Sequence, residues 1–125
     1  MPCGPEELLE FRDRLARSAK LIIVEGPKDM SSLRAISVTN PILMLSKKPL
    51  YAVAEQAASL SKDIVILTDL DTEGKKLFGR LSTDLQHLGC RIDNTFREFL
   101  FKKTKLRQIE GIKTYLESST STPRP

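Results

Sequence analysis

The sequence predicts an α/β fold: a small four-stranded parallel sheet flanked by helices, with further helices at the C-terminal end. Two short runs of mainly branched aliphatic residues, at 21–24 and 64–68, are bounded by turn residues, as buried strands of parallel sheets are. Amphipathic segments alternate with these runs, and such alternation implies right-handed crossovers between parallel strands. The 125 residues are enough for one domain with a buried core.

The first half of the chain carries the signals for three helices and two strands. A proline and two glutamates precede an apolar helical repeat, and these residue types are favoured in the first turn of a helix. The next helix follows a Gly-Pro turn, and we expect Asp29 or Ser31 to cap it. A second strand is expected over 37–39, stopped by an Asn-Pro pair, whereas residues 42–45 fit either strand or loop. In order, we expect a helix over 5–18, a strand over 21–24, a helix to Ile36, a strand over 37–39 and an alanine-rich helix over 50–60.

The second half begins with the strand at 64–68. Leucines and Phe78 then recur at three- and four-residue spacing, which predicts an amphipathic helix that Gly89 ends. Cys90 opens a short strand, and we expect it to be a buried hydrophobe because Cys3 and Cys90 show no disulfide or metal spacing. Two helices broken near Thr104 follow. The predicted organisation is one domain over 1–117, with a core over 20–93, C-terminal helices over 95–117 and a disordered polar tail over 118–125.

Composition restricts the partners. The net charge of +4 and the pI near 9.2 suit a polyanionic partner, although solubility alone explains them equally well. The N-terminus has no charged-then-apolar signal pattern, and no apolar run reaches the length needed to span a membrane. We therefore expect a cytoplasmic protein with no membrane partner.

Two of the predicted strands end in acids: Glu25 follows the first, and Asp69 and Asp71 follow the third. Since the carboxyl ends of parallel strands meet at one edge of a sheet, these carboxylates should converge. Converging acids repel one another without a cation, so the pattern predicts a Mg²⁺ site, with Mn²⁺ as a substitute. A single acid after a strand more often caps the next helix. Here we expect Thr72 or Glu73 to provide that cap, which leaves both aspartates free.

Other catalytic motifs do not fit. The phosphate-cradling G-x-x-x-x-G-K-[ST] and the dinucleotide-binding G-x-G-x-x-G are absent. His87 has no neighbouring acid or cysteine, so a surface or packing role is expected and no nucleophilic triad can be assembled. The D-x-D-T sequence at Asp69 also resembles the haloacid-dehalogenase phosphatases. In that family, however, the motif closes the first strand, and a lysine and a further acidic pair follow downstream. Here the motif closes the third predicted strand, and only the scattered Asp84 and Asp93 follow Asp71.

The acids and their neighbours resemble the Toprim domain, the catalytic module of topoisomerases, DnaG-type primases, OLD-family and RecR proteins and the bacterial maturases of 5S ribosomal RNA. The resemblance covers about residues 20–93 and implies a small parallel sheet between helices. It also implies that Glu25 is a general acid or base beside the metal, and that Asp69 and Asp71 bind Mg²⁺. We expect a small stand-alone member of the family. The matching residues are Glu25-Gly26, Asp29 and Leu33 in helical phase with them, and Asp69-x-Asp71-x-x-Gly74.

Basic residues near the acids and at the C-terminal end are candidates for contacts with substrate phosphates. Solvated surface lysines are the equally favoured alternative. The candidate substrate-binding residues are Lys28, Asp29, Lys75 and Lys76 near the acids, and Arg97, Lys102, Lys103, Lys105 and Arg107 in a basic C-terminal face interleaved with aromatic residues.

Together these features predict a Mg²⁺-dependent endoribonuclease that cleaves structured RNA, with maturation of 5S ribosomal RNA as the leading role. Ribosomal RNA precursor is the expected partner, with a ribosomal protein or the ribosome as further candidates. Two alternatives stay open. One is a DNA-processing protein that nicks DNA or assists repair, and the other is a non-catalytic module that binds nucleic acid.

Overall fold

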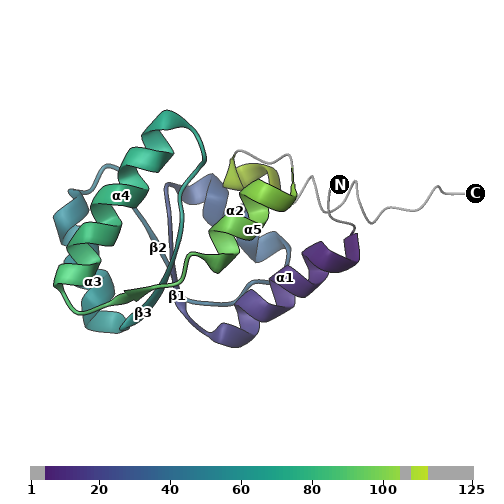
Figure 1. Cartoon of the computed structure of the whole chain (residues 1–125), viewed down its shortest axis with the longest axis horizontal. Coiled ribbons are helices and arrows are strands. Elements are labelled where there is room, and N and C mark those ends of the chain that lie inside the picture. Colours follow the sequence, from purple (N-terminus) through teal and green to yellow (C-terminus); the bar gives the residue numbers. More distant parts are fainter. Residues whose placement is uncertain (1–4, 105–107, 113–125) are drawn as a thin grey trace, which may run out of the picture.

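Four parallel strands form one sheet in the computed structural model, which describes residues 5–104 and 108–112 (Figure 1). The spatial order is β2-β1-β3-β4, and each neighbouring pair runs parallel. The predicted fold class is therefore confirmed. The strands are β1 (Leu21–Val24), β2 (Ile42–Met44), β3 (Asp63–Leu67) and β4 (Arg91–Ile92).

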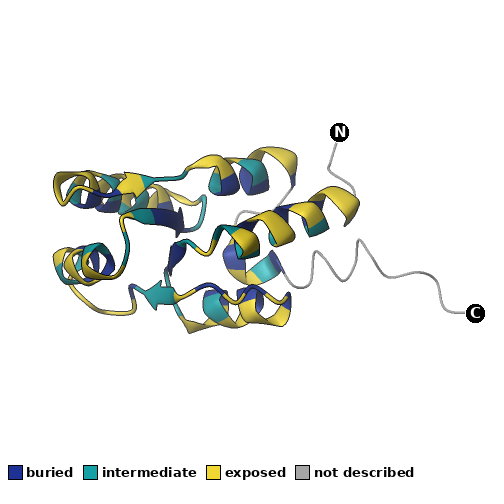
Figure 2. Ribbon diagram, turned by 90° about the horizontal axis from the view of Figure 1, so that it is seen from below, coloured by how far each residue is buried: buried dark blue, intermediate teal, exposed yellow. Residues whose placement is uncertain are grey.

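Helices cover both faces of this sheet. The helices α1, α2 and α5 and the turn η1 pack on one face, and α3 and α4 pack on the other (Figure 1). In β1, Ile22 and Val24 face the first group while Leu21 and Ile23 face the second, because successive side chains of a strand alternate. Figure 2 shows the buried side of each layer turned inward. The helical elements are α1 (Pro5–Ser18), α2 (Pro27–Ala35), α3 (Leu50–Leu60), α4 (Thr72–His87), α5 (Thr95–Lys103) and the 3₁₀ turn η1 (Ile109–Gly111).

The second strand is β2, and the prediction of a strand over 37–39 is wrong. Ser37 has a φ of 70°, in the left-handed region that a strand does not contain. The guanidinium of Arg34 donates to the carbonyls of Val38 and Asn40, at 2.8 and 2.7 Å, so these carbonyls bond to a side chain and not to a neighbouring strand. The second strand, which pairs with β1, is Ile42–Met44, within residues 42–45, whose sequence fits either strand or loop.

Most other boundaries agree with the predictions. The helices α1 and α3 occupy the expected residues, and Gly89, with a φ of 84°, follows the end of α4. Cys90 is buried as expected, although β4 is shorter than predicted. The helix α5 ends at Lys103, which confirms the predicted break near Thr104.

Several predictions fall outside the described residues, namely Cys3, Lys105, Arg107, the end of the last predicted helix and the tail over 118–125. The domain boundaries stay a prediction. Within the described ranges, none of the helices is both long enough and apolar enough to cross a membrane. His87 is exposed at the end of α4.

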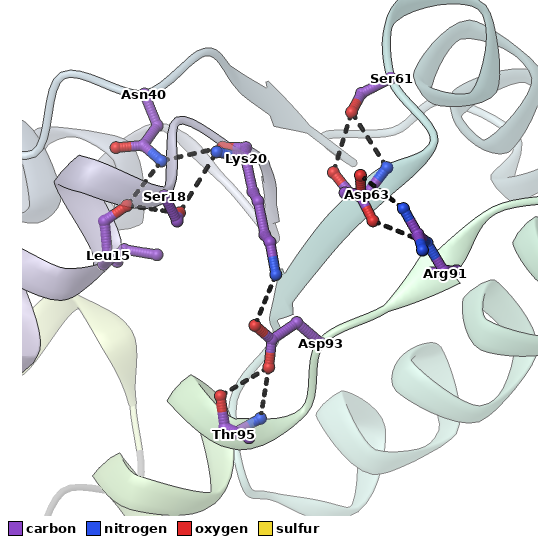
Figure 3. A network of polar contacts seen from close by, with 9 residues as sticks. All are labelled: Leu15, Ser18, Lys20, Asn40, Ser61, Asp63, Arg91, Asp93 and Thr95. Atoms are coloured by element: carbon purple, nitrogen blue, oxygen red, sulfur yellow. Dashed lines mark hydrogen bonds and ion pairs between the residues drawn. The ribbon is translucent and has the colours of Figure 1, made fainter.

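A polar network ties β4 and the residue after it to β3 and to the residue before β1 (Figure 3). Arg91 pairs with Asp63 at 2.9 Å between Nε and Oδ1, and Lys20 pairs with Asp93 at 2.9 Å between Nζ and Oδ2. The hydroxyl and amide of Thr95 donate to the other oxygen of Asp93, at 2.5 and 2.9 Å. These bonds attach the short last strand and set the start of α5.

Candidate functional site

The predicted acids lie at the carboxyl ends of β1 and β3, which are neighbours in the sheet. The chain leaves β1 toward β2 on one side and returns to β3 on the other, so this edge is a topological switch point, where α/β sheets bind ligands. Glu25 and Asp69 are joined directly, since the Asp69 amide donates to Glu25 Oε2 at 2.7 Å. The convergence of these two acids agrees with the prediction.

The loop after β3 is closed by Gly74. Its amide donates to Asp71 Oδ1 at 2.7 Å, and its carbonyl accepts from the Thr68 hydroxyl at 2.8 Å. A Cβ on Gly74 would lie 2.0 Å from the carbonyl oxygen of Asp69. The glycine of the D-x-D-x-x-G sequence is thus required for close approach of α4 to the loop.

Asp71 is the cap of α4, so the expectation that Thr72 or Glu73 provides this cap is wrong. Asp71 has extended backbone angles, with φ −73° and ψ 176°, and its carboxylate reaches the amide three residues later. One Asp71 oxygen is therefore engaged in capping.

Asp29 lies inside α2 and does not cap it as the residue before the helix. The helix begins at Pro27 after Gly26, and the Asp29 carboxylate accepts from the Gly26 amide at 2.9 Å. In a capping box, the side chain of the third helical residue accepts a hydrogen bond from the amide of the residue before the helix, and Asp29 and Gly26 make this contact. Ser31 is exposed further along the same helix. Asp29 is 6% exposed and lies beside the other acids.

Burial and mutual repulsion raise the pKa of three of these carboxyl groups. Partial burial is the largest cause for Glu25, Asp29 and Asp69, and neighbouring acids add to it. Amide donors act in the opposite direction without cancelling the shift. The site therefore concentrates negative charge that a bound cation relieves.

Arg97 holds the main chain of the site. Its guanidinium donates to the carbonyls of Thr68 and Asp69, at 3.1 and 2.8 Å, and lies 4.6 Å from the ring centre of Phe78 and 5.2 Å from that of Phe101. The prediction placed Arg97 in an outward basic face. In the structure this side chain supports the loop that carries Asp69.

The predicted lysines are all exposed among the described residues. Lys28 lines the same groove as Glu25, Asp29 and Asp69, so the structure brings it to the acids. Lys75 and Lys76 lie in the first turns of α4, close in sequence to Asp71. Lys102 and Lys103 end α5, and Lys102 Nζ lies 4.0 Å from Glu98.

The sequence prediction missed the contribution of residues 108–110. Gln108 and Glu110 line the groove, whose volume is about 350 Å³, together with the acids. The Ile109 amide donates to Asp69 Oδ1 at 2.8 Å. The apolar spacing of Ile109 and Ile112 predicts burial, but it does not indicate which edge of the sheet the segment reaches.

Comparison with known proteins decides the family. The sequence profile of the Toprim-like family matches residues 22–102. The chain belongs to the Toprim-like family. Relatives of this Toprim-like chain include a UPF0292 protein of Pyrococcus abyssi, 42% identical over 100 residues that make up 80% of this chain and 74% of the relative. A UPF0292 protein of Methanocaldococcus jannaschii is 30% identical over 116 residues, 89% of this chain and 91% of the relative.

A solved structure supports the same fold. A putative protein from Aquifex aeolicus superimposes on this Toprim-like chain with a TM-score of 0.74 and 29% sequence identity, over 81% of this chain and 94% of that one. The resemblance seen in the sequence is confirmed. A Toprim-like domain associates the chain with metal-dependent enzymes that process nucleic acids.

The donor chemistry of the Toprim-like site fits a hard divalent cation. Glu25, Asp69 and Asp71 each give one oxygen to a main-chain amide, and the described part of the chain provides no hydrogen-bond partner for the second oxygen. Among residues 5–104 and 108–112, no group of three or more His, Cys, Asp or Glu side chains is arranged so that it could hold a metal ion. Mg²⁺ retains several waters and uses one or two carboxylates, so an open arrangement of this kind suits it.

Proposed function

We propose that this Toprim-like protein is a Mg²⁺-dependent endoribonuclease that cleaves phosphodiester bonds in structured RNA, with the precursor of 5S ribosomal RNA as its candidate substrate. The observation that carries the proposal is the arrangement of Glu25, Asp69 and Asp71 at the ends of two neighbouring strands, each with one carboxylate oxygen left over. Family membership supports the processing of nucleic acid.

The roles of the acids follow from their surroundings. Asp69 and Asp71 would hold Mg²⁺ or Mn²⁺ through their second oxygens. When bound, the ion offsets charge on the phosphoryl oxygens and acidifies a water molecule. Glu25 would accept or return a proton at Oε1, because the Asp69 amide engages only Oε2 and leaves Oε1 beside the other two acids.

Exposed lysines supply the attraction for the RNA backbone. Lys28 lies in the groove itself, so it can contact a phosphate next to the acids. Lys75 and Lys76 extend positive charge along α4, and Lys102 and Lys103 place more at the end of α5. Binding through such contacts releases counterions and weakens steeply as salt is added.

The test is cleavage of an end-labelled 5S ribosomal RNA precursor in Mg²⁺, in Mn²⁺ and in EDTA, beside duplex DNA of the same sequence. Asp69→Asn and Asp71→Asn should abolish cleavage. Both variants should stay folded, because an asparagine oxygen still accepts the amides that these aspartates accept. Asp13→Asn, in an exposed acid of α1, is the matched control and should cleave normally.

The outcomes separate the alternatives. Cleavage of RNA at the wild-type rate by both site variants would contradict the proposal. Cleavage of DNA alone would identify a DNA-processing protein. Tight binding of either nucleic acid without cleavage would identify a binding module.

A further inference from the structure

The segment from Gln108 to Ile112 lies beyond the part of the chain that matches the family, yet it reaches the site. Ile109 and Ile112 are buried in the same hydrophobic cluster as Leu33 of α2. The hydroxyl of Ser32, also in α2, donates to the carbonyl of Glu110 at 2.5 Å. The segment is therefore anchored on α2, where Figure 1 shows it as a short yellow-green turn.

Asp69 is held from three directions. Its amide donates to Glu25 and its carbonyl accepts from Arg97, so its main chain is fixed by residues inside the family match. Its side chain is fixed from outside that match, because the Ile109 amide donates to Oδ1 at 2.8 Å. A hydrogen bond from an amide to a carboxylate is charge-assisted and directional, so it determines the orientation of the carboxyl group.

The same segment also forms one wall of the groove. Gln108 and Glu110 lie on it, and Lys28, Asp29 and Glu25 lie among the other lining residues. The bond from Ile109 occupies Oδ1 and leaves Oδ2 as the Asp69 oxygen available to a ligand. The segment is thus placed to set both the shape of the groove and the orientation of the Asp69 carboxylate in it.

We propose that Gln108–Ile112 is a positioning element of the cation site, in which the Ile109 amide orients the Asp69 carboxylate and thereby sets the affinity for a divalent ion. This inference rests on the proposed function, since it takes the carboxylates as cation ligands. Partners that orient a ligating carboxylate are worth about 10–100-fold in metal affinity.

The bond can be removed by Ile109→Pro, which deletes the N–H. The local backbone accepts proline, because Ile109 is the first residue of η1 and Gln108 is extended, with φ −131° and ψ 137°. Ile109→Ala is the matched control. It keeps the N–H and removes at least as much of the buried side chain. Binding of Mn²⁺ to the full chain is measured by the electron paramagnetic resonance of free Mn²⁺, and stability is measured by urea unfolding in EDTA.

The proline variant should bind Mn²⁺ about 10–100-fold more weakly than the alanine variant, while urea unfolding in EDTA shows that both variants are folded. Equal affinities of the two variants, with binding intact in the wild type, would overturn this inference alone. Tighter binding by the proline variant would also overturn it, because the amide would then compete with the cation. No Mn²⁺ binding by the wild type would overturn the proposed function and this inference with it.

A second variant keeps the test decisive if the proline variant does not fold. Ser32→Ala releases the carbonyl of Glu110 and should weaken Mn²⁺ binding by up to about tenfold, the worth of one hydrogen bond. Ser59→Ala removes a similar hydroxyl-to-carbonyl bond within α3 and should leave the affinity unchanged. Equal affinities of these two serine variants would count against the positioning role.

Discussion

Gly74→Ala tests how closely α4 approaches the loop that carries the acids. The added Cβ would lie 2.0, 2.6 and 2.9 Å from the carbonyl oxygen, carbonyl carbon and amide nitrogen of Asp69. Non-bonded heavy atoms rest at roughly 3.5–4.0 Å, and all three neighbours are main-chain atoms that no rotamer change can move. The loop must shift, and the Asp71 cap must lengthen or break with it.

The magnitude follows from three contributions. Overpacking costs about 1–3 kcal/mol, and loss of the Asp71 cap costs about 1 kcal/mol. The higher helix propensity of alanine returns about 1 kcal/mol. We therefore expect the free energy of unfolding of Gly74→Ala to fall by about 1–3 kcal/mol, with weaker Mn²⁺ binding because Asp69 and Asp71 both move.

The assay is urea unfolding in EDTA followed by circular dichroism, with Gly79→Ala as the control. Gly79 lies in the same helix, is exposed and has no atom within 4 Å of its added Cβ, so alanine there should stabilise the protein by about 0.5–1 kcal/mol. If Gly74→Ala unfolds at the same urea concentration as the wild type, or is stabilised like Gly79→Ala, the steric reasoning is refuted.

Three further predictions concern charge. Burial raises the pKa of Asp93, but hydrogen bonds from Thr95 and Lys20 outweigh it and leave the pKa low. Asp93→Asn should therefore lower stability by about 1–2 kcal/mol near pH 7, and urea unfolding should show this loss shrinking as pH falls through the low folded-state pKa. Asp69 has a raised pKa, so its contribution to stability is lost as pH rises. Asp69→Asn should be more stable than the wild type in EDTA near pH 7, and an equal advantage near pH 4 would contradict this. Replacing Lys102 and Lys103 by Ala should reduce the salt slope of RNA binding by about 1–2, and an unchanged slope would remove them from the interface.

The fold was predictable wherever local pattern and burial agree. The run of β1, and that of β3 after Asp63, is aliphatic because both faces of the sheet are covered, and such runs can be identified from neighbouring residues alone. The second strand was not predictable in this way. Residues 37–39 contain a β-branched pair, Val38 and Thr39, and β2 is a short apolar run, so both fit a strand locally. In the structure Ser37 has a φ of 70° and Arg34 binds the carbonyls of Val38 and Asn40, contacts that the local pattern does not reveal.

The same distinction between local pattern and tertiary contact applies to the site. The position of the acids follows from their place after neighbouring parallel strands, but their hydrogen bonds do not. Asp71 caps a helix, Asp29 reaches back to Gly26, and Arg97 supports the loop main chain. Each of these roles depends on side-chain geometry across a turn or between elements. Residue type and spacing do not contain that geometry.

The sequence was sufficient to identify β1 and β3, the acids at their ends and the resemblance to the Toprim-like family, because these depend on short-range patterns of burial and turn residues. The bond between Ile109 and Asp69, which lies 40 residues earlier in the chain, depends instead on how distant segments pack. That contact exists because Ile109 and Ile112 lose their exposure to water against α2, and this burial brings the amide to the carboxylate. The free energy of such a contact comes from packing between distant segments, so no local pattern encodes it.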